Sequence, residues 1–330
     1  MKRLNLLKSV YVALAMLLAG LLCACQTAAE HTEATISVTS AEFHFSDGGH
    51  AISYALQKPG GHVPANAVQN LLFVIPGSDC ISMAAMLPAY FKGLEGDSGR
   101  TQIYILQKRH IHPYSRVSYC GEAFTRDDHL QQWLSDQAEF ILATLKLHRD
   151  AAAPQRVILM GISEGAETAT MLAQHLPISH LVLLAHSGKA PLQVYRELAQ
   201  SNQNMEQAWQ TLNAALNQSQ LDEQTLVHGR SLRYWREIQT MAQTETLIKL
   251  SIPVLIAAGG QDPVMPVGTD AFLAELNQKS QGRIQVLWFA RADHALRHPE
   301  HAYLPDFMYL LEQWLRQDKQ VINRGFLALE

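Results

Sequence analysis

The fold is decided by one stretch of the chain, Arg156-Val157-Ile158-Leu159-Met160-Gly161-Ile162-Ser163-Glu164-Gly165. An apolar strand over Arg156–Met160 runs directly into the pattern Gly-x-Ser-x-Gly, and a helical stretch follows to about His175. Glycines on both sides of a serine allow a sharp turn from strand to helix, which lifts the Ser163 hydroxyl above the edge of the sheet. The N-terminus of the following helix favours negative charge that develops beside it. A purely structural turn would explain the glycines but not the serine, so the stretch predicts a nucleophile.

Short apolar strands alternate with helical stretches on both sides of this motif. This alternation is typical of a parallel sheet that is covered by helices on both faces. A hairpin is expected before it, because the Gly-rich Ser46-Asp47-Gly48-Gly49 separates two β-like runs, Ile36–Phe45 and His50–Gln57. The expected strands are Leu71–Ile75, Ile103–Leu106, Arg156–Met160, Leu181–Ala185, Pro253–Ala258 and Ile284–Phe289, with helices over Asp127–Leu147 and from Pro299 or Pro305 to about Leu315.

One segment, residues 189–249, interrupts the alternation with polar, Gln-rich sequence and no strand-like run. Met205, Trp209, Leu212 and Leu216 follow one another at helical spacing, and the aromatic pair Tyr234-Trp235 comes later. A poorly ordered linker would need neither the stripe nor the aromatic pair. We therefore expect a packed helical cap, inserted between two strands at their carboxyl ends, that covers the site and sets its specificity.

A serine nucleophile needs a histidine to take its proton and a carboxylate to orient that histidine. Asp262 follows the strand Pro253–Ala258, and Asp293-His294 follows the strand Ile284–Phe289. Carboxyl ends of parallel strands meet at one edge of the sheet, where open α/β sheets build their sites. Asp262 is the better acid, because Asp293 cannot easily reach the ring of its own neighbour while that ring faces Ser163.

Two further histidines, His298 and His301, compete with His294 for the role of base. Both flank Pro299, at or just before the predicted start of the last helix. An imidazolium is disfavoured near a helix N-terminus, so a base that must become protonated is badly placed there. The sequence therefore favours His294.

With these motifs in this order, the chain resembles the α/β-hydrolase family over about residues 50–320. The resemblance implies the α/β-hydrolase fold, with Ser163 as nucleophile, Asp262 as acid and His294 as base. It also implies an oxyanion hole formed by the N–H of Glu164 and one N–H from the loop Pro76-Gly77-Ser78-Asp79-Cys80. Pro76 stands where the family commonly has histidine, which leaves Ser78 and Asp79 as donors, and we choose Ser78.

The resemblance leaves the substrate open. The Ser-Glu-Gly form of the motif and the helical insert are similar to those of exported esterase-like and prolyl-oligopeptidase-like hydrolases. We expect a serine hydrolase that cleaves an ester or related acyl bond through an acyl-enzyme on Ser163. A serine peptidase or aminoacyl amidase is the alternative of the same fold, and a non-catalytic, lipid-anchored binding protein is the alternative of another class.

The 15 histidines raise the further possibility of a metal-dependent hydrolase. His110-Ile111-His112 has the spacing of metal ligands, as does the set His294, His298 and His301. The sequence has no H-E-x-x-H motif, and His110-Ile111-His112 has no acidic residue nearby. We expect neither a metal nor a cofactor.

Composition excludes several classes of partner. The 330 residues include 26 Lys+Arg and 30 Asp+Glu, for a net charge of −4, with no long run of either sign. A nucleic-acid-binding protein would show a basic patch or stripe. The expected partner is a small-molecule or acyl substrate, and the sequence does not fix the oligomeric state.

The N-terminus has the parts of a secretory signal: a basic start, an apolar run from Val10 to Leu22 and small residues after it. We assign residues 1–24 to a lipoprotein-type signal peptide, 25–34 to a tether and 35–330 to the hydrolase domain. Leu22-Cys23-Ala24-Cys25 resembles a bacterial lipobox with Cys25 as the lipidated residue, although cleavage without lipidation is the alternative. The expected location is the bacterial cell envelope, facing the periplasm, with the lipid anchor as the only membrane contact.

Two cysteines, Cys80 and Cys120, remain in the folded part. In an exported protein they are readily oxidised to one bridge, which we favour over two separate buried thiols.

Overall fold

The computed structural model describes residues 37–58, 69–78, 80–115, 120–149, 155–316 and 325–330. The predicted signal peptide, the lipidation site Cys25 and the tether 25–34 lie outside these residues, as does Asp79. Within the described ranges, no helix is both long and apolar enough to cross a membrane.

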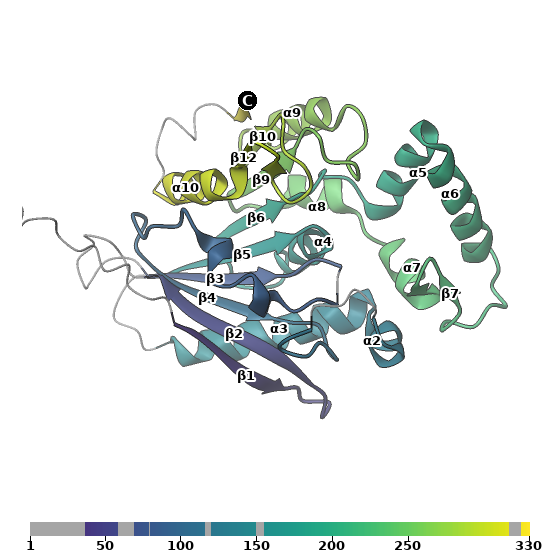
Figure 1. Cartoon of the computed structure of the whole chain (residues 1–330), viewed down its shortest axis with the longest axis horizontal. Coiled ribbons are helices and arrows are strands. Elements are labelled where there is room, and N and C mark those ends of the chain that lie inside the picture. Colours follow the sequence, from purple (N-terminus) through teal and green to yellow (C-terminus); the bar gives the residue numbers. More distant parts are fainter. Residues whose placement is uncertain (1–36, 59–68, 79, 116–119, 150–154, 317–324) are drawn as a thin grey trace, which may run out of the picture. The chain divides into compact units, whose positions relative to one another are not determined.

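A nine-stranded sheet in the order β1-β2-β4-β3-β5-β6-β9-β10-β13 forms the centre of the domain (Figure 1). The predicted N-terminal hairpin is present, because β1 pairs antiparallel with β2, and β2 pairs antiparallel with β4. All other neighbouring strands are parallel. The strands are β1 (Val38–His44), β2 (His50–Lys58), β3 (Gln69–Ile75), β4 (Arg100–Leu106), β5 (Gln155–Ile162), β6 (His180–Leu184), β9 (Val254–Gly259), β10 (Ile284–Phe289) and β13 (Phe326–Leu329).

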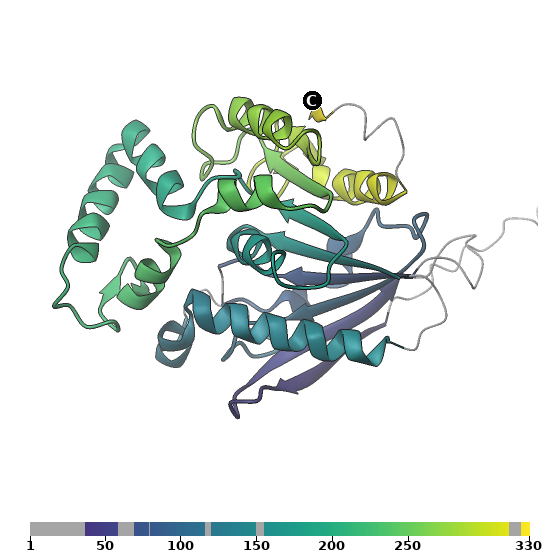
Figure 2. The same cartoon turned by 180° about the vertical axis from the view of Figure 1, so that it is seen from behind.

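Helices cover both faces of this sheet, as predicted (Figures 1 and 2). One face carries α3 (Leu130–Leu147), α4 (Glu164–Leu172), α8 (Gln243–Lys249) and α9 (Thr269–Lys279), which pack beside one another in that order. The other face carries α10 (Tyr303–Leu315) and the short 3₁₀ helix η2 (Ala89–Phe91), with η1 (Met83–Ala85) before it. Apolar side chains of α3, α4, α8 and α9 form one core with the central strands.

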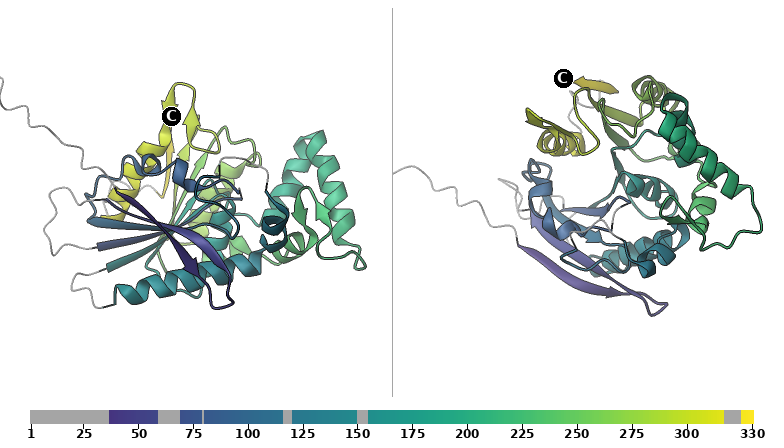
Figure 3. Two further views of the ribbon diagram at one scale, coloured as in Figure 1. Left: turned by 60° about the horizontal axis from the view of Figure 1, so that its bottom comes forward. Right: turned by 45° about the vertical axis from the view of Figure 1, so that its right-hand side comes forward.

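The insert forms a cap with its own core. It contains α5 (Pro191–Ser201), α6 (Gln203–Leu216), a hairpin whose strands β7 (Leu226–Val227) and β8 (Arg230–Ser231) have two residues each, and α7 (Leu232–Ile238). Leu212, Leu232, Trp235 and Ile238 meet in its interior, apart from the main core. Figure 3 shows these elements beyond the carboxyl ends of the strands. The cap is shorter than the predicted 189–249, because Leu247 of α8 packs into the main core.

Two helix starts differ from the prediction, and one strand is missing from it. The helix expected over Asp127–Leu147 is α3, which begins at Leu130 because Asp127 ends the separate short helix α2 (Glu122–Asp127). The last helix begins at Tyr303, between the two expected starts, so His301 lies just before it. His298 and His301 pair across the short hairpin of β11 (Arg297–His298) and β12 (His301–Ala302). The edge strand β13 has no counterpart among the predicted strands.

Candidate active site

Three loops at the carboxyl ends of the strands bring Ser163, His294 and Asp262 together. Ser163 stands between β5 and α4, Asp262 follows β9 and His294 follows β10. His294 Nε2 lies 3.0 Å from Ser163 Oγ, and His294 Nδ1 lies 2.6 Å from Asp262 Oδ2. The Asp262 side chain is fully buried, whereas the His294 side chain is 37% exposed. The arrangement suits a ring that donates from Nδ1 to the carboxylate and accepts the serine proton at Nε2.

The backbone at Ser163 shows why glycines flank it. Ser163 has φ of 54° and ψ of −123°, a conformation that costs an L-residue about 1–3 kcal/mol. A Cβ on Gly161 would lie 2.3 Å from the Gly165 carbonyl oxygen, and a Cβ on Gly165 would lie 2.2 Å from that of Ile75. Any larger residue at either position would force the turn open. The turn also ties into the sheet, since Ser163 N–H donates to the Leu184 carbonyl at 2.8 Å.

The carboxylates near His294 have separate tasks. Asp262 Oδ1 accepts the Val264 N–H at 2.9 Å, which holds the acid in place while Oδ2 faces the ring. Asp293 Oδ1 accepts the N–H groups of Ala295 and Arg297, so it shapes the loop that carries His294.

The competing histidines lie elsewhere. His298 is within 3.3 Å of Arg291 Nη2, and His301 Nε2 is 2.5 Å from Asp306 Oδ2. His110 pairs with Asp127 at 2.7 Å. In the part of the chain that the structure describes, no three His, Cys, Asp or Glu side chains gather into a cluster that could hold a metal ion.

A pocket of about 730 Å³ opens at Ser163 and His294. The cap supplies one part of its lining, and the remainder comes from the strand ends, from α4 and from the loops after β9 and β10. Apolar and aromatic side chains dominate, with a few polar groups among them, which is usual for a small-molecule site. Its aromatic and titratable lining residues beyond Ser163 and His294 are Glu164, Glu167, His186, Tyr195, His228, Arg230, Tyr234 and Trp235.

The predicted oxyanion residues both lie at this pocket. Glu164 begins α4, where the first N–H groups have no acceptor within the helix. Ser78 follows β3 and also lines the pocket. Their roles as donors stay predictions, and the alternative donor Asp79 lies outside the described residues.

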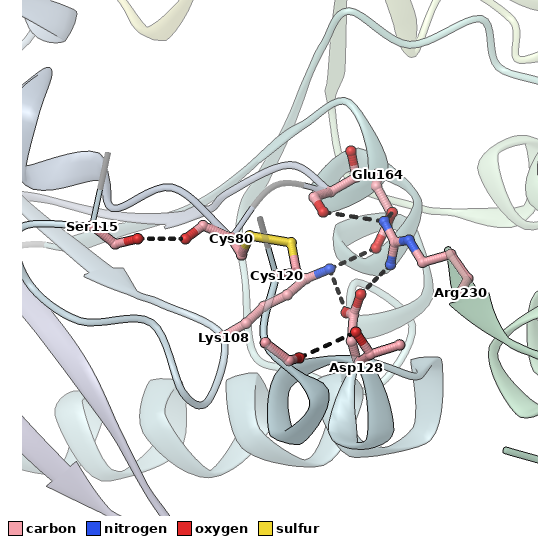
Figure 4. The surroundings of a disulfide bond; sticks show 10 residues. Cys80, Lys108, Ser115, Cys120, Asp128, Glu164 and Arg230 are labelled. Carbon is pink, nitrogen blue, oxygen red and sulfur yellow. Dashed lines mark hydrogen bonds and ion pairs between the residues drawn. A yellow bond between two sulfur atoms is a disulfide. The ribbon is translucent and has the colours of Figure 1, made fainter. Parts of the chain in front are cut away.

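The Glu164 side chain forms the centre of a buried charge network (Figure 4). Glu164 Oε1 accepts from Lys108 Nζ at 2.7 Å, and Oε2 accepts from Arg230 Nη2 at 2.7 Å. Asp128 accepts from the same two cations, from Lys108 at 2.6 Å and from Arg230 at close range. Tyr234 Oη adds a third donor to Glu164 at 3.2 Å.

This network fixes the charge state of Glu164. Burial raises the pKa of this carboxyl, but the positive charges and hydrogen bonds of Lys108 and Arg230 more than offset the effect, and the pKa falls to about 2. Glu164 therefore stays ionised at neutral pH. Since Arg230 belongs to β8, the network joins the nucleophile turn to the cap.

Arg230 also reaches the predicted oxyanion loop. Its Nη2 donates to the main-chain carbonyl of Ser78 at 3.1 Å, in addition to its bond to Glu164. One cap guanidinium thus contacts both residues that are predicted to supply oxyanion N–H groups.

The predicted bridge between Cys80 and Cys120 is present. It joins the chain just after Ser78 to the segment before α2, whose C-cap is Asp128 of the charge network (Figure 4). Ser115 Oγ adds a hydrogen bond to the Cys80 carbonyl at 3.3 Å. The predicted oxyanion loop is therefore held both by the disulfide and by Arg230.

Sequence reasoning found the three residues that the structure joins in a hydrogen-bonded chain, but it missed Lys108, Asp128, Arg230 and Glu167. The signal for Glu167 was available, because it stands four residues after Ser163 and so on the same side of the predicted helix. The other three come from different loops and carry no local pattern.

A scan against models of protein families and a search of curated protein sequences give no match. Solved structures do match. A puromycin-hydrolysing peptidase from Mycobacterium tuberculosis aligns with a TM-score of 0.56 and 14% identity, over 89% of this chain and 41% of that one. Est1E from Butyrivibrio proteoclasticus, solved with ferulic acid bound, aligns with a TM-score of 0.54 and 16% identity, over 85% of this chain and 100% of its own.

An acylaminoacyl peptidase from Pyrococcus horikoshii aligns with a TM-score of 0.53 and 12% identity, over 87% of this chain and 42% of that one. The chain thus spans under half of each peptidase and the full length of Est1E. Likeness at these identities shows the fold, and function has to be argued from the site. The chain has the α/β-hydrolase fold, as the sequence predicted.

Proposed function

We propose that the protein is a serine hydrolase that cleaves an ester or related acyl bond. The observation that carries the proposal is the hydrogen-bonded chain Ser163–His294–Asp262, with its serine end open to a pocket of about 730 Å³. Solved structures of similar fold include an esterase and peptidases, which supports hydrolysis in general and leaves the leaving group open.

The mechanism follows from the atoms in place. His294 Nε2 takes the Ser163 proton as Oγ attacks the substrate carbonyl, and Asp262 stabilises the imidazolium. The oxyanion receives hydrogen bonds from the N–H groups of Glu164 and Ser78. His294 gives its proton to the leaving group, which departs and leaves an acyl group on Ser163. Water, deprotonated by His294, then attacks the acyl-enzyme and releases the acid.

Hydrolysis of an amide by the same steps is the second candidate, as in a peptidase or aminoacyl amidase. The supporting observation is that two of the similar structures are peptidases. In a non-catalytic binding protein, by contrast, Ser163 would not be activated and would not react as a nucleophile.

Two measurements test the proposal. A fluorophosphonate probe labels only an activated serine, so wild type should react and Ser163→Ala should not. A panel of aryl esters, lipid esters and aminoacyl amides, assayed with both proteins, then ranks the leaving groups. Equal turnover of every substrate by wild type and Ser163→Ala would reject Ser163 as the nucleophile.

We further propose that the chain is exported and anchored through a lipid on Cys25, with the hydrolase domain facing the periplasm. The motivation is the basic and apolar leader with its lipobox-like end, and the Cys80–Cys120 bridge suits an oxidising compartment. Metabolic labelling with a fatty acid should mark the wild type in a membrane fraction and leave Cys25→Ser unlabelled. Label retained by Cys25→Ser would place the anchor elsewhere.

A further inference from the structure

One carboxyl in the pocket lies outside the charge network. Glu164 and Asp128 each receive hydrogen bonds from Lys108 and Arg230. In the described part of the chain, no group donates a hydrogen bond to the Glu167 carboxyl. Gln243 Nε2 bonds the main-chain oxygen of Glu167 instead, at 2.9 Å. The network's two cations are thus shared by two other carboxylates, and Glu167 has no counter-charge of its own.

Glu167 lies in the same pocket as Ser163. It is on α4, the helix whose N-cap is Ser163, and it follows Ser163 by four residues. A group bound by the Glu167 carboxyl would therefore share the pocket with a carbonyl that Ser163 attacks.

Three aromatic rings line the pocket together with this carboxyl. Tyr195, Tyr234 and Trp235 line the same pocket and contact one another edge to face, with ring centroids 5.3 Å apart for Tyr195–Trp235 and 5.1 Å for Tyr234–Trp235. Burial, and then the negative charges of Glu164 and Glu167, raise the pKa of both tyrosines, while the Arg230 guanidinium acts in the opposite direction. A carboxylate among aromatic faces is the combination that binds ammonium groups.

The charged groups around Glu167 act on the pKa of its carboxyl in both directions. Burial, and then the charge of Glu164, raise its pKa well above the ordinary value, while Arg230 and Lys108 act in the opposite direction. A cation bound in the pocket would supply the missing positive charge and allow Glu167 to ionise. Among the residues that line the pocket in the described ranges, Arg230 is the one lysine or arginine, and it is already bound to Glu164 and Asp128.

We propose that Glu167 is a specificity-determining residue that binds an ammonium group near the scissile carbonyl of the substrate, so that the favoured substrates are aminoacyl esters or amides. The proposal rests on the proposed serine hydrolase function. The aromatic wall of Tyr195, Tyr234 and Trp235 would hold the same group and exclude water from the ion pair.

The test compares two esters that differ only in charge: phenylalanine methyl ester and the isosteric ester in which a methyl group replaces the ammonium group. Product formation is followed by chromatography at a pH where the amine is protonated. Wild type should prefer the ammonium ester in kcat/KM by about tenfold or more, the usual scale for a charge-assisted hydrogen bond. Glu167→Gln should remove most of that preference by lowering kcat/KM for the ammonium ester.

Glu197→Gln is the matched control. Glu197 is a cap carboxylate on α5, paired with Lys189 at 2.5 Å and absent from the lining of this pocket. It should keep the wild-type preference. Equal kcat/KM for the two esters in wild type, or an unchanged preference in Glu167→Gln, would overturn the proposal.

Binding provides a readout that does not need turnover. Calorimetry with Ser163→Ala should show tighter binding of the ammonium ester, and the double variant with Glu167→Gln should lose the difference. Equal binding of both esters, or none, rejects the ammonium site. Failure of the serine hydrolase assignment would look different, since Ser163→Ala would then hydrolyse substrates as fast as wild type.

Discussion

Replacing Arg230 by methionine tests whether the cap holds the oxyanion residues in place. The change keeps much of the side-chain volume and removes the guanidinium that bonds Glu164, the Ser78 carbonyl and Asp128. Breaking a buried ion pair by removing one partner costs about 3–5 kcal/mol. Lys108 still contacts both carboxylates, and the Arg230 side chain is 18% exposed, so the lower end applies. We expect a loss of about 3 kcal/mol and a fall in Tm of about 6–12 °C.

Activity separates a positioning role from a structural one. Removing an oxyanion donor outright costs about 10²–10³ in kcat. Arg230→Met leaves the donors present but frees Ser78 and Glu164 to move, so we expect a loss of about tenfold in kcat, with a smaller change in KM. Steady-state kinetics with the best ester from the panel, below the Tm of the variant, give both values.

Two variants control this experiment. Arg230→Lys keeps the positive charge but loses the planar set of N–H donors of the guanidinium. Compared with Arg230→Met, it should therefore recover the stability of wild type more fully than its kcat. Arg236→Met removes another cap arginine, one that pairs with Glu223 and bonds the Gln218 carbonyl away from the site. It should leave kcat unchanged. If Arg230→Met lowers Tm while kcat stays at the wild-type value, Arg230 is scaffold and the reasoning fails.

Three further outcomes are expected. His294→Ala should lose about 10³-fold or more in kcat, as other triads do, while His298→Ala stays within about tenfold; similar losses in both would move the base. Cys80→Ala should lower the free energy of unfolding by up to about 4 kcal/mol in the chain-entropy model. Urea unfolding without reductant measures this difference from wild type. The difference should disappear when reductant opens the bridge in wild type. Glu167→Gln should have a higher Tm than wild type at pH 8 and nearly the same Tm as wild type at pH 4. The reason is that a carboxyl whose pKa is raised in the folded state destabilises the fold increasingly as pH rises above its unfolded pKa near 4.5. If variant and wild type have the same Tm at both pH values, burial of Glu167 has no energetic cost.

The sheet was predictable because its strands are buried on both sides. Leu71–Ile75 and Ile284–Phe289 are continuous apolar runs, and each lies inside a strand of the structure. The last strand, Phe326–Leu329, is only four residues long and pairs at the edge of the sheet, where a short run carries little signal. The same holds for the hairpin at His298 and His301, whose strands have two residues each.

The triad was predictable for a topological reason, and the charge network was not. Each triad residue stands within five residues of the end of an apolar strand, so recognising the strands also locates the residues. Lys108, Asp128 and Arg230 meet through loop and cap geometry, with Arg230 and Asp128 separated by 102 positions. Tyr234 and Trp235 stood out as an aromatic pair in a cap that was expected to set specificity, yet Trp235 is 1% exposed and its ring N–H donates to the Val227 carbonyl at 2.8 Å. Its replacement would disturb the cap core as much as the pocket.

Glu164 connects the two halves of the site. Its N–H is a predicted oxyanion donor, and its carboxylate is bound from the cap by Arg230 and from the sheet by Lys108. A neutral residue at this position would leave two buried cations with Asp128 alone, so the charge cannot change without changes at Lys108 and Arg230. The cap is therefore not an independent lid over a finished site. Its position, the Ser78 loop and the nucleophile turn share one set of hydrogen bonds, and specificity at Glu167 is built on the helix that this set holds in place.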